Sequence, residues 1–458
     1  MGQVKITFYG GVGEIGGNKI LVEDKGYDVR LLLDFGKSFK IASQYYQFPI
    51  DYPSSLDELL DLGAIPQIEN LYTREFLARR NGDVGGEEEP PVDACLISHA
   101  HMDHAQYISL LNRKIPVYVS ECSYSILTAA DQIWRTRLET NFSGIKFEVF
   151  KNGQKIKVGN LEIKALYVDH SIPGASAFIL YTSEGPLAYT GDFRLHGTFE
   201  TLTSAFIDAL RMEEKIIALI FESTSIFRSR MQSERNVEDS AGILASACRG
   251  LVIADFSSTD FFRFQTFYKV ARKCGREIVI TERFAKIVEA INQYPEYRWP
   301  GLRSSGDIRI IPDAQRRERW REEMRRRFPD LYINWDEVRK NPQKYIFCTS
   351  YNSVRDLRTI KPEPGSIYIL SSSEPFNEER ELAFEKLLNW LEKLNVPMYR
   401  IHASGHATPH EIQQLVHETR PKVIIPIHTE YPAVIAGFLQ GLSEKSLIPE
   451  KGITYEIQ

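Results

Sequence analysis

The chain has 458 residues, of which 43% are hydrophobic and 26% charged, and its formal net charge is −5. This is ordinary globular composition in a chain too long for one hydrophobic core, so two domains are expected. No run of about 18 uncharged apolar residues occurs, which excludes a membrane-spanning helix. The N-terminus lacks a signal-peptide pattern, so a cytoplasmic protein is expected. The negative charge argues against bulk coating of nucleic acid, but it does not exclude a local basic groove.

The five cysteines are scattered and show no CxxC spacing, so we interpret them as reduced thiols. The first forty residues predict three strands, around 5–9, 18–22 and 29–34. Residues 11–16 match the GxGxxG dinucleotide fingerprint, which requires a helix to begin at the glycines. Residues 18–23 instead have a strand pattern, so a hairpin turn is predicted.

Residues 40–93 are less regular and predict a loop-rich insertion that covers a site. From Ala94 to about Phe221, strands alternate with short helical stretches, as in a layered α/β domain. The apolar strand predicted over 216–222 ends in Glu222, and the segments after it are typical of a small parallel α/β unit.

Within that middle unit, residues 309–327 carry eight arginines. The favoured interpretation is a solvated helix face with ion pairs to interleaved glutamates, and a phosphate-contacting face is the alternative. The aromatic run over 260–268 is assigned to the core, with base stacking as the alternative. A helix is predicted over 377–394, followed by strands over 398–402 and 422–428.

Apolar strands in this chain repeatedly end near side chains that can bind a metal. In layered α/β folds the strand ends are where such side chains converge. The residues concerned are Asp34, His99, His170, Asp192, Glu222, His406 and His428.

The sharpest cluster follows the strand at 95–98. Three of the ten histidines, His99, His101 and His104, occur within six residues together with Asp103. Ligands at these spacings can serve two different ions, and imidazole nitrogen with carboxylate oxygen suits zinc or manganese. Further ligands are expected from His170 and from Asp192, a carboxylate well placed to bridge two cations. The sequence itself therefore predicts a two-metal hydrolase.

Other histidines divide into two groups. His406 and His428 lie some 300 residues from the first cluster. If they join it, the metal-binding domain is interrupted by the middle unit. His196, His410 and His417 have no comparable setting and are interpreted as surface or supporting residues.

These residues identify a family resemblance. The run His99-x-His101-x-Asp103-His104 resembles the signature of the metallo-β-lactamase fold. Glu222 in Phe-Glu-Ser-Thr-Ser, His406 in Ser-Gly-His and His428 in Ile-Pro-Ile-His resemble the β-CASP branch of nucleases. The segments 402–411 and 421–431, and the opening 11–18, look most like RNase J.

The resemblance implies an α/β chain with a four-layer αββα metallo-β-lactamase fold and an inserted β-CASP domain. The expected boundaries are 1–226 and 399–458 for the metallo-β-lactamase parts and 227–398 for the insert. It further implies two zinc ions, with manganese or magnesium as alternatives.

The resemblance also assigns roles to the site residues. His99, His101 and His170 would hold one ion, and Asp103, His104 and His428 the other, with Asp192 bridging. Asp34 would orient ligand histidines, and Glu222 would pair with His406, which faces the scissile phosphate. Asp103, His406 and Glu222 are the expected catalytic residues, and Ser404 and Gly405 are candidates for a phosphate contact, with a plain turn as the alternative.

The predicted function is hydrolysis of RNA phosphodiester bonds, by exonuclease or endonuclease action on a single strand. A DNA nuclease or a small-molecule phosphodiesterase or esterase of the same fold is the alternative, and a silent scaffold is disfavoured because every ligand position is filled. No membrane partner is expected, and a homodimer is left open.

Overall fold

The computed structural model describes residues 3–46, 51–77, 88–134, 138–227, 232–292, 294, 300–303, 306–313, 318–350, 354–372 and 378–457. The chain divides into two compact units. Unit 1 comprises Met1–Leu195, Phe199–Arg230 and Gly405–Gln458, and unit 2 comprises His196–Thr198 and Met231–Ser404. The domain boundaries implied by the resemblance, and the name of the inserted domain, stay predictions.

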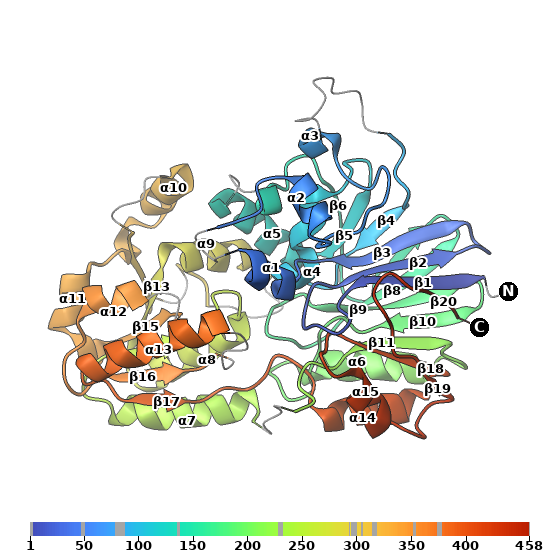
Figure 1. Cartoon of the computed structure of the whole chain (residues 1–458). Coiled ribbons are helices and arrows are strands. Elements are labelled where there is room, and N and C mark those ends of the chain that lie inside the picture. Colours follow the sequence, from blue (N-terminus) through green and yellow to red (C-terminus); the bar gives the residue numbers. More distant parts are fainter. Residues whose placement is uncertain are drawn as a thin grey trace. The chain divides into compact units, whose positions relative to one another are not determined.

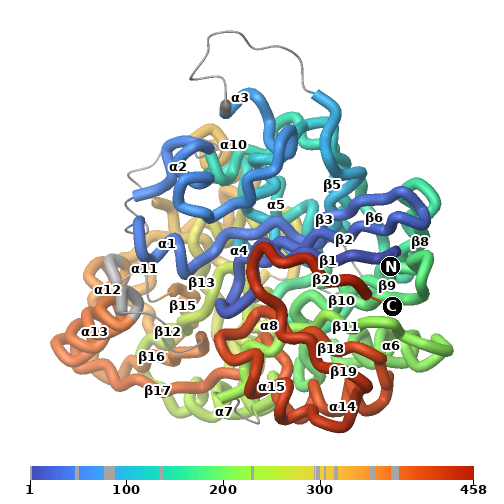
Figure 2. Tube along the Cα trace, turned by 45° about the vertical axis from the view of Figure 1, so that its right-hand side comes forward, coloured from blue at the N-terminus to red at the C-terminus, as the bar shows by residue number. Residues whose placement is uncertain are grey.

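Unit 1 contains two seven-stranded sheets. In the first, the strand order is β20-β1-β2-β3-β4-β5-β6. Its strands are β1 Val4–Gly10, β2 Lys19–Asp24, β3 Val29–Phe35, β4 Ala94–Leu96, β5 Pro116–Ser120, β6 Lys146–Phe150 and β20 Thr454–Ile457. Because β20 pairs with β1, the two ends of the described chain lie side by side (Figure 2).

In the second sheet the order is β19-β18-β11-β10-β9-β8-β7. Its strands are β7 Lys155–Val158, β8 Leu161–Tyr167, β9 Ser176–Thr182, β10 Gly185–Tyr189, β11 Ala218–Glu222, β18 Val423–Ile427 and β19 Lys445–Ser446. Strands β11 and β18 pair in parallel although some 200 residues separate them in sequence. Both are buried along their whole length, as their unbroken apolar sequences predict.

Helices cover the outer faces of both sheets (Figure 1). Helices α6, α14 and α15 share one hydrophobic core with the second sheet, and α4 and α5 contact the first. The described helices of unit 1 are α1 Phe39–Tyr45, α2 Leu56–Asp61, α3 Arg74–Leu77, α4 Met102–Ala105, α5 Glu121–Trp134, α6 Glu200–Arg211, α14 Pro409–Thr419 and α15 Pro432–Phe438. The mixed α/β class is confirmed.

Unit 2 has a six-stranded parallel sheet in the order β14-β13-β15-β12-β16-β17. Its strands are β12 Val252–Asp255, β13 Glu277–Thr281, β14 Ile308–Ile311, β15 Tyr345–Thr349, β16 Ile367–Leu370 and β17 Met398–Arg400. Its helices are α7 Glu234–Ala247, α8 Phe261–Lys273, α9 Glu282–Ile291, α10 Arg319–Arg327, α11 Trp335–Lys340, α12 Val354–Ile360 and α13 Glu378–Lys393. The predicted parallel α/β character of the middle segment is confirmed.

The structure distinguishes between the alternatives for the glycine-rich turn and for the aromatic run. Strands β1 and β2 pair antiparallel, so the glycines between them form a hairpin turn and no helix begins there. The aromatic run over 260–268 opens α8, and Phe261, Phe262, Phe264 and Phe267 are each at most 2% exposed, so these rings belong to the core. The predicted strand over 216–222 is shorter, since β11 begins at Ala218.

The segment 40–93 contains α1, α2 and α3, so it is more helical than predicted; residues 47–50 and 78–87 lie outside the described part. Whether this segment covers a site stays a prediction. Across the described residues, no helix is long and apolar enough to cross a membrane.

Gly36, directly after β3, packs closely against the backbone of Asp103, and a substitution there tests this contact. A Cβ atom there would lie 1.7 Å from the carbonyl oxygen of Asp103, a backbone atom that cannot swing aside. We expect Gly36→Ala to lower the free energy of unfolding by about 3 kcal/mol or more, and to weaken metal binding through Asp103. Thermal and denaturant unfolding measure the first effect.

Gly242 in α7 is the matched control. A Cβ atom at this helical position meets open space, so Gly242→Ala should raise stability by about 0.5–1 kcal/mol. Equal stability of the two variants would contradict the close approach of Gly36 to Asp103.

Candidate metal centre

The candidate site residues come from six strand ends of unit 1 and from two loops. Asp34 is the penultimate residue of β3, His99 follows β4, His170 follows β8, Asp192 follows β10 and His428 follows β18. The other two candidates are Glu222, the last residue of β11, and His406, in the segment before α14. The structure brings all of them together with His101, Asp103 and His104 in one cluster, in which His101 and His406 are partly exposed and the other members are buried.

Asp192 lies at the centre of the cluster. Its Oδ2 atom is 3.2 Å from His104 Nε2, 3.8 Å from His99 Nε2 and 3.7 Å from His170 Nε2. The same oxygen is 3.6 Å from His406 Nδ1 and 3.9 Å from His428 Nε2. One carboxylate oxygen therefore lies within 4 Å of five imidazoles.

The ligand atoms near Asp192 include two groups of three. In the first, His101 Nδ1 is 2.9 Å from His99 Nε2 and 3.2 Å from His170 Nε2. In the second, His428 Nε2 is 3.2 Å from Asp103 Oδ2 and 3.3 Å from His104 Nε2. Tetrahedral zinc with bonds of about 2.0–2.1 Å separates its nitrogen ligands by about 3.3 Å. These separations are close to what one cation in each group requires.

Charge and burial also fit a cation. The Oδ1 atom of Asp192 is buried and makes no hydrogen bond to any described residue. A buried carboxylate left in that state is costly, and a bound cation removes the cost. The donor set, imidazole nitrogens with carboxylate oxygens, is one that zinc and manganese accept. The described residues thus fit metal binding.

The pKa values point the same way. Burial lowers the pKa of His99 and His170 well below the usual value, and that of His101 to about 4, despite the nearby carboxylates. These three rings are therefore neutral near pH 7, which is the form that binds metals. Burial opposes ionisation of Asp103 and Asp192, but the histidines outweigh it and lower both pKa values.

Asp34 holds His104 in place. Its Oδ2 atom lies 2.7 Å from His104 Nδ1 and accepts hydrogen bonds from Ser98 Oγ at 2.8 Å and Tyr189 Oη at 2.5 Å. A proton on Nδ1 leaves Nε2 of His104 to face the site. Burial lowers the pKa of His104, but Asp192, Asp103 and Asp34 outweigh it and raise that pKa well above the usual value. A proton displaced from Nε2 accordingly accompanies metal binding there.

Both Asp34 and His428 have left-handed backbone conformations, with φ of 57° and 54°. Such conformations are uncommon outside glycine and cluster at functional sites. The backbone N–H of His428 donates to Gly11 at 2.7 Å, and that of Asn18 donates to Asp103 at 3.0 Å. The glycine-rich turn at residues 11–18 is thus hydrogen-bonded to the loops that carry Asp103 and His428.

Glu222 and His406 are neighbours. Glu222 Oε1 lies 3.5 Å from His406 Nδ1 and accepts a hydrogen bond from the Ala407 N–H at 2.8 Å. Burial lowers the pKa of His406, but Glu222 and Asp192 outweigh it and raise that pKa to about 9. The ring, a quarter exposed, is thus a proton donor at neutral pH in the metal-free protein.

Gly405 contacts a site residue with its backbone: its carbonyl oxygen lies 2.5 Å from His170 Nδ1. Ser404 belongs to unit 2, where its carbonyl oxygen accepts from His196 Nε2 at 3.0 Å. A phosphate-binding role for either residue stays a prediction. His410 and His417 are exposed on α14.

The sequence did not single out Ser98, Tyr189 or Thr224. Thr224 Oγ1 lies 2.8 Å from His428 Nδ1 and so orients that ring. Thr224 lies two residues beyond Glu222 and Ser98 directly precedes His99, so their positions beside strand ends were the available signal. Tyr189 has a buried hydroxyl inside a strand, and only the fold reveals its partner.

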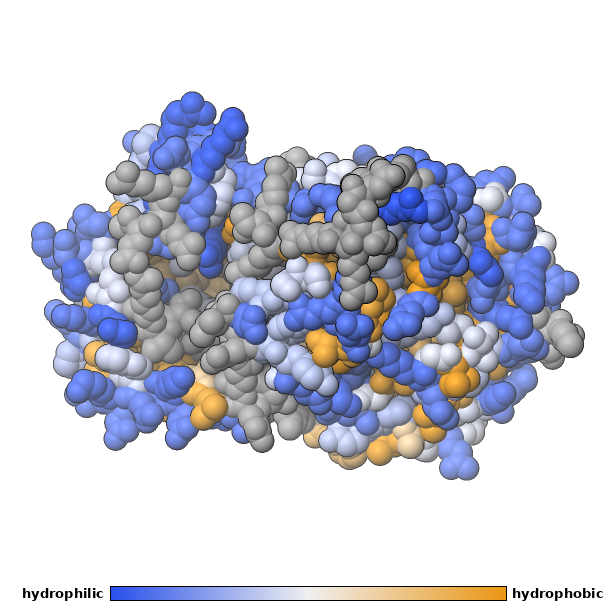
Figure 3. Space-filling view, turned by 45° about the horizontal axis from the view of Figure 1, so that its top comes forward, coloured by the Kyte–Doolittle hydropathy of each residue, from blue (hydrophilic) through white to orange (hydrophobic). Residues whose placement is uncertain are grey.

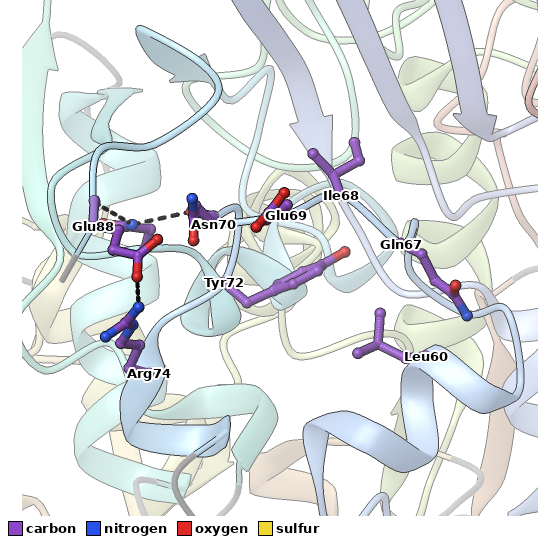
Figure 4. A pocket seen from close by; sticks show the side chains of 9 residues that line it. Leu60, Gln67, Ile68, Glu69, Asn70, Tyr72, Arg74 and Glu88 are labelled. Carbon is purple, nitrogen blue, oxygen red and sulfur yellow. Dashed lines mark hydrogen bonds and ion pairs between the residues drawn. The ribbon is translucent and has the colours of Figure 1, made fainter. Parts of the chain in front are cut away.

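Unit 1 also has a cavity of about 430 Å³ in the segment 60–74 and beside Glu88 and Asn112 (Figure 4). Asn112 Nδ2 donates to the carbonyl oxygens of Asn70 and Glu88, and Arg74 pairs with Glu88. None of the proposed metal ligands lines it.

Two family descriptions match the chain. Residues 67–214 match the family described as "Beta-lactamase superfamily domain". The chain carries a metallo-β-lactamase domain. Residues 393–436 match the family described as "Zn-dependent metallo-hydrolase RNA specificity domain". The predicted metallo-β-lactamase fold is thereby confirmed.

Similar proteins agree with this result. The chain is 26% identical to Ribonuclease J of Sinorhizobium meliloti over 75% of its own length and 59% of that protein's. It is 24% identical to Ribonuclease J of Helicobacter pylori over 98% of its own length, again 59% of the relative. It is 23% identical to Ribonuclease J of Thermus thermophilus over 99% of its own length and 74% of that protein's. The predicted likeness to RNase J is confirmed, and the chain spans less than two thirds of the first two relatives.

A solved structure from Enterococcus faecalis V583, titled as a protein of unknown function, has the same fold. The TM-score is 0.77 at 23% identity, covering 99% of this chain and 100% of the other.

The Glu222–His406 pair generates a prediction for the metal-free protein. Glu222→Gln should lower the pKa of His406 by about one unit or more, because the effect of burial is then opposed by Asp192 and Asp103 without Glu222. Because the pKa of His406 is higher in the folded than in the unfolded state, protonation of this ring stabilises the fold. That contribution to the free energy of unfolding is complete below the unfolded-state pKa and is lost as the pH rises through about 9. NMR titration of the histidine Cε1 protons measures the shift.

Glu148→Gln is the control, since that carboxylate lies on β6 and pairs with Lys146. An unchanged pKa of His406 in Glu222→Gln would show that the pair does not interact.

Proposed function

We propose that this chain is a metal-dependent ribonuclease that hydrolyses phosphodiester bonds in single-stranded RNA. The observation that carries the proposal is the single Asp192 oxygen surrounded by two groups of buried ligand atoms. The match of residues 393–436 to an RNA specificity domain and the similarity to proteins named Ribonuclease J support RNA as the substrate.

The proposed metals are two zinc ions, with manganese or magnesium as alternatives. His99, His101 and His170 would hold one ion and Asp103, His104 and His428 the other, with Asp192 between them. When bound, such ions lower the pKa of a water molecule towards neutrality and offset the charge of the phosphate. Zinc is supported by the histidine-rich donor set and by the wording of the matched family.

The protein's own groups would complete the reaction. Asp103 accepts a hydrogen bond from the attacking water and so directs its oxygen at phosphorus. As the new phosphorus–oxygen bond forms, the bond to the leaving oxygen breaks, and His406 donates its proton there. Glu222 keeps His406 protonated and fixes the Ala407 amide beside it. Asp34 acts through His104 as a positioning residue.

The substrate class can be tested directly. The purified chain with zinc or manganese is incubated with 5′-monophosphorylated, 5′-triphosphorylated and circular RNA and with the matching DNA. Cleavage of circular RNA marks an endonuclease, and mononucleotides released only from 5′-monophosphate ends mark an exonuclease. Cleavage of DNA alone, or of no nucleic acid with the metals bound, would overturn the proposal. A homodimer and a cytoplasmic location stay predictions.

His406 provides a second test. His406→Ala should reduce kcat for RNA by about 10²–10⁴-fold, the usual contribution of a general acid, while both metals stay bound. Metal analysis of the same sample separates a proton donor from a ligand. His410→Ala, exposed on α14, is the control and should keep full activity. Metal content that falls in parallel with activity would make His406 a ligand instead.

A further inference from the structure

The arginine-rich segment of unit 2 divides into arginines with different surroundings. Arg321 and Arg325 form ion pairs with the buried carboxylate of Glu282, with nitrogen–oxygen distances of 2.7 Å. These two stabilise the packing of α10 against α9. This differs from the predicted solvated face, because Arg321 is buried and Glu282 lies on another helix, whereas Arg327 and Glu323 form a pair of the predicted i,i+4 kind. Arg316 and Arg317 lie outside the described residues. The surface over α10 is strongly hydrophilic (Figure 3).

Other arginines of this region line a cavity of about 700 Å³ inside unit 2. Its walls come from the last turns of α9 and α10, from residues 302–303 and from Phe328. The positively charged residues that line its described part are Lys286, Arg303 and Arg327, and the negatively charged one is Glu289. Among the described lining residues, three cations against one anion give a charge of +2, in a chain whose net charge is −5.

Phe328 holds the two arginines in a fixed arrangement. The guanidinium carbons of Arg303 and Arg327 each lie 5.2 Å from the centre of its ring, which is 7% exposed. Arg303 Nη2 also donates to the carbonyl oxygen of Arg327 at 2.5 Å. A guanidinium held this way loses less freedom when it binds, and its planar fork matches the oxygens of a phosphate.

The carboxylate of Glu289 reduces the positive charge of the cavity but does not cancel it. Its carboxylate lies 3.5 Å from Lys286 Nζ and pairs with Arg327 Nη1. The Arg327 side chain is still 46% exposed, so it can reach a ligand in the cavity. Glu323 also lies 4.0 Å from Arg327 Nη1. Two carboxylates do not neutralise three cations, so an anion is the ligand that the described part of the cavity favours.

We propose that this cavity binds phosphate groups, at a site separate from the candidate metal centre. The phosphates can come from a nucleic-acid strand or from a free phosphorylated molecule. The strand source rests on the proposed ribonuclease function. Phosphate binding itself does not, and it is measured without hydrolysis.

The test compares the wild type with Arg303→Ala/Arg327→Ala in the full chain. The probes are a phosphorothioate single-stranded RNA, adenosine 5′-monophosphate and inorganic phosphate, and binding is followed across salt concentrations by anisotropy or calorimetry. We expect the removal of each arginine to weaken binding roughly threefold. For the strand, the slope of log K against log salt should fall by about 0.7 for each phosphate that the variant no longer neutralises.

Arg339→Ala is the matched control, a partly exposed arginine of unit 2 that pairs with Asp336 and does not line the cavity. Glu289→Gln changes the charge in the opposite direction and should tighten binding, which keeps the test informative if the double variant unfolds. Weaker strand binding assigns the cavity to the substrate, and weaker binding of the two small probes alone assigns it to free phosphates. Equal binding of every probe by the double variant and Arg339→Ala, or weaker binding by Glu289→Gln, would overturn the proposal.

Discussion

The candidate metal centre is arranged around one buried oxygen atom, Oδ2 of Asp192. Five imidazole nitrogens lie within 4 Å of it. A carboxylate removed from water needs positive charge nearby. The raised pKa values of His104 and His406 let these two rings supply it in the metal-free protein, whereas His99, His101 and His170 have pKa values too low to do so. Cations at the two groups of ligand atoms meet this need. The strands, the glycine-rich turn and the supporting hydrogen bonds can all be understood as holding those ligands against their mutual repulsion.

The pairing of β11 with β18 explains how distant segments share one site. His428 follows β18 and Glu222 ends β11, and the two strands lie side by side in parallel register. Unit 2 enters the chain between them. The insertion therefore leaves the centre intact, because the second sheet of unit 1 closes across the interruption.

Much of this could be predicted from particular residues. The strand ends at Asp34, His99, Asp192 and His428 could be located because apolar runs stop there at polar side chains. The hairpin after β1 followed from the strand pattern of residues 18–23. Thr224 and Tyr189 could not be assigned, because their hydroxyls act on partners more than 150 residues away. The arginines around α10 look alike in sequence, and only the fold separates those that pair with Glu282 from those that line the cavity.

The central claim is that Asp192 lies between two cations. X-ray diffraction from crystals of the metal-loaded protein, measured on both sides of the absorption edge of the bound metal, tests it most directly. The account predicts two anomalous peaks, one beside His99, His101 and His170 and one beside Asp103, His104 and His428, with Asp192 touching both. A single peak, or none at these residues in protein that hydrolyses RNA, would contradict it.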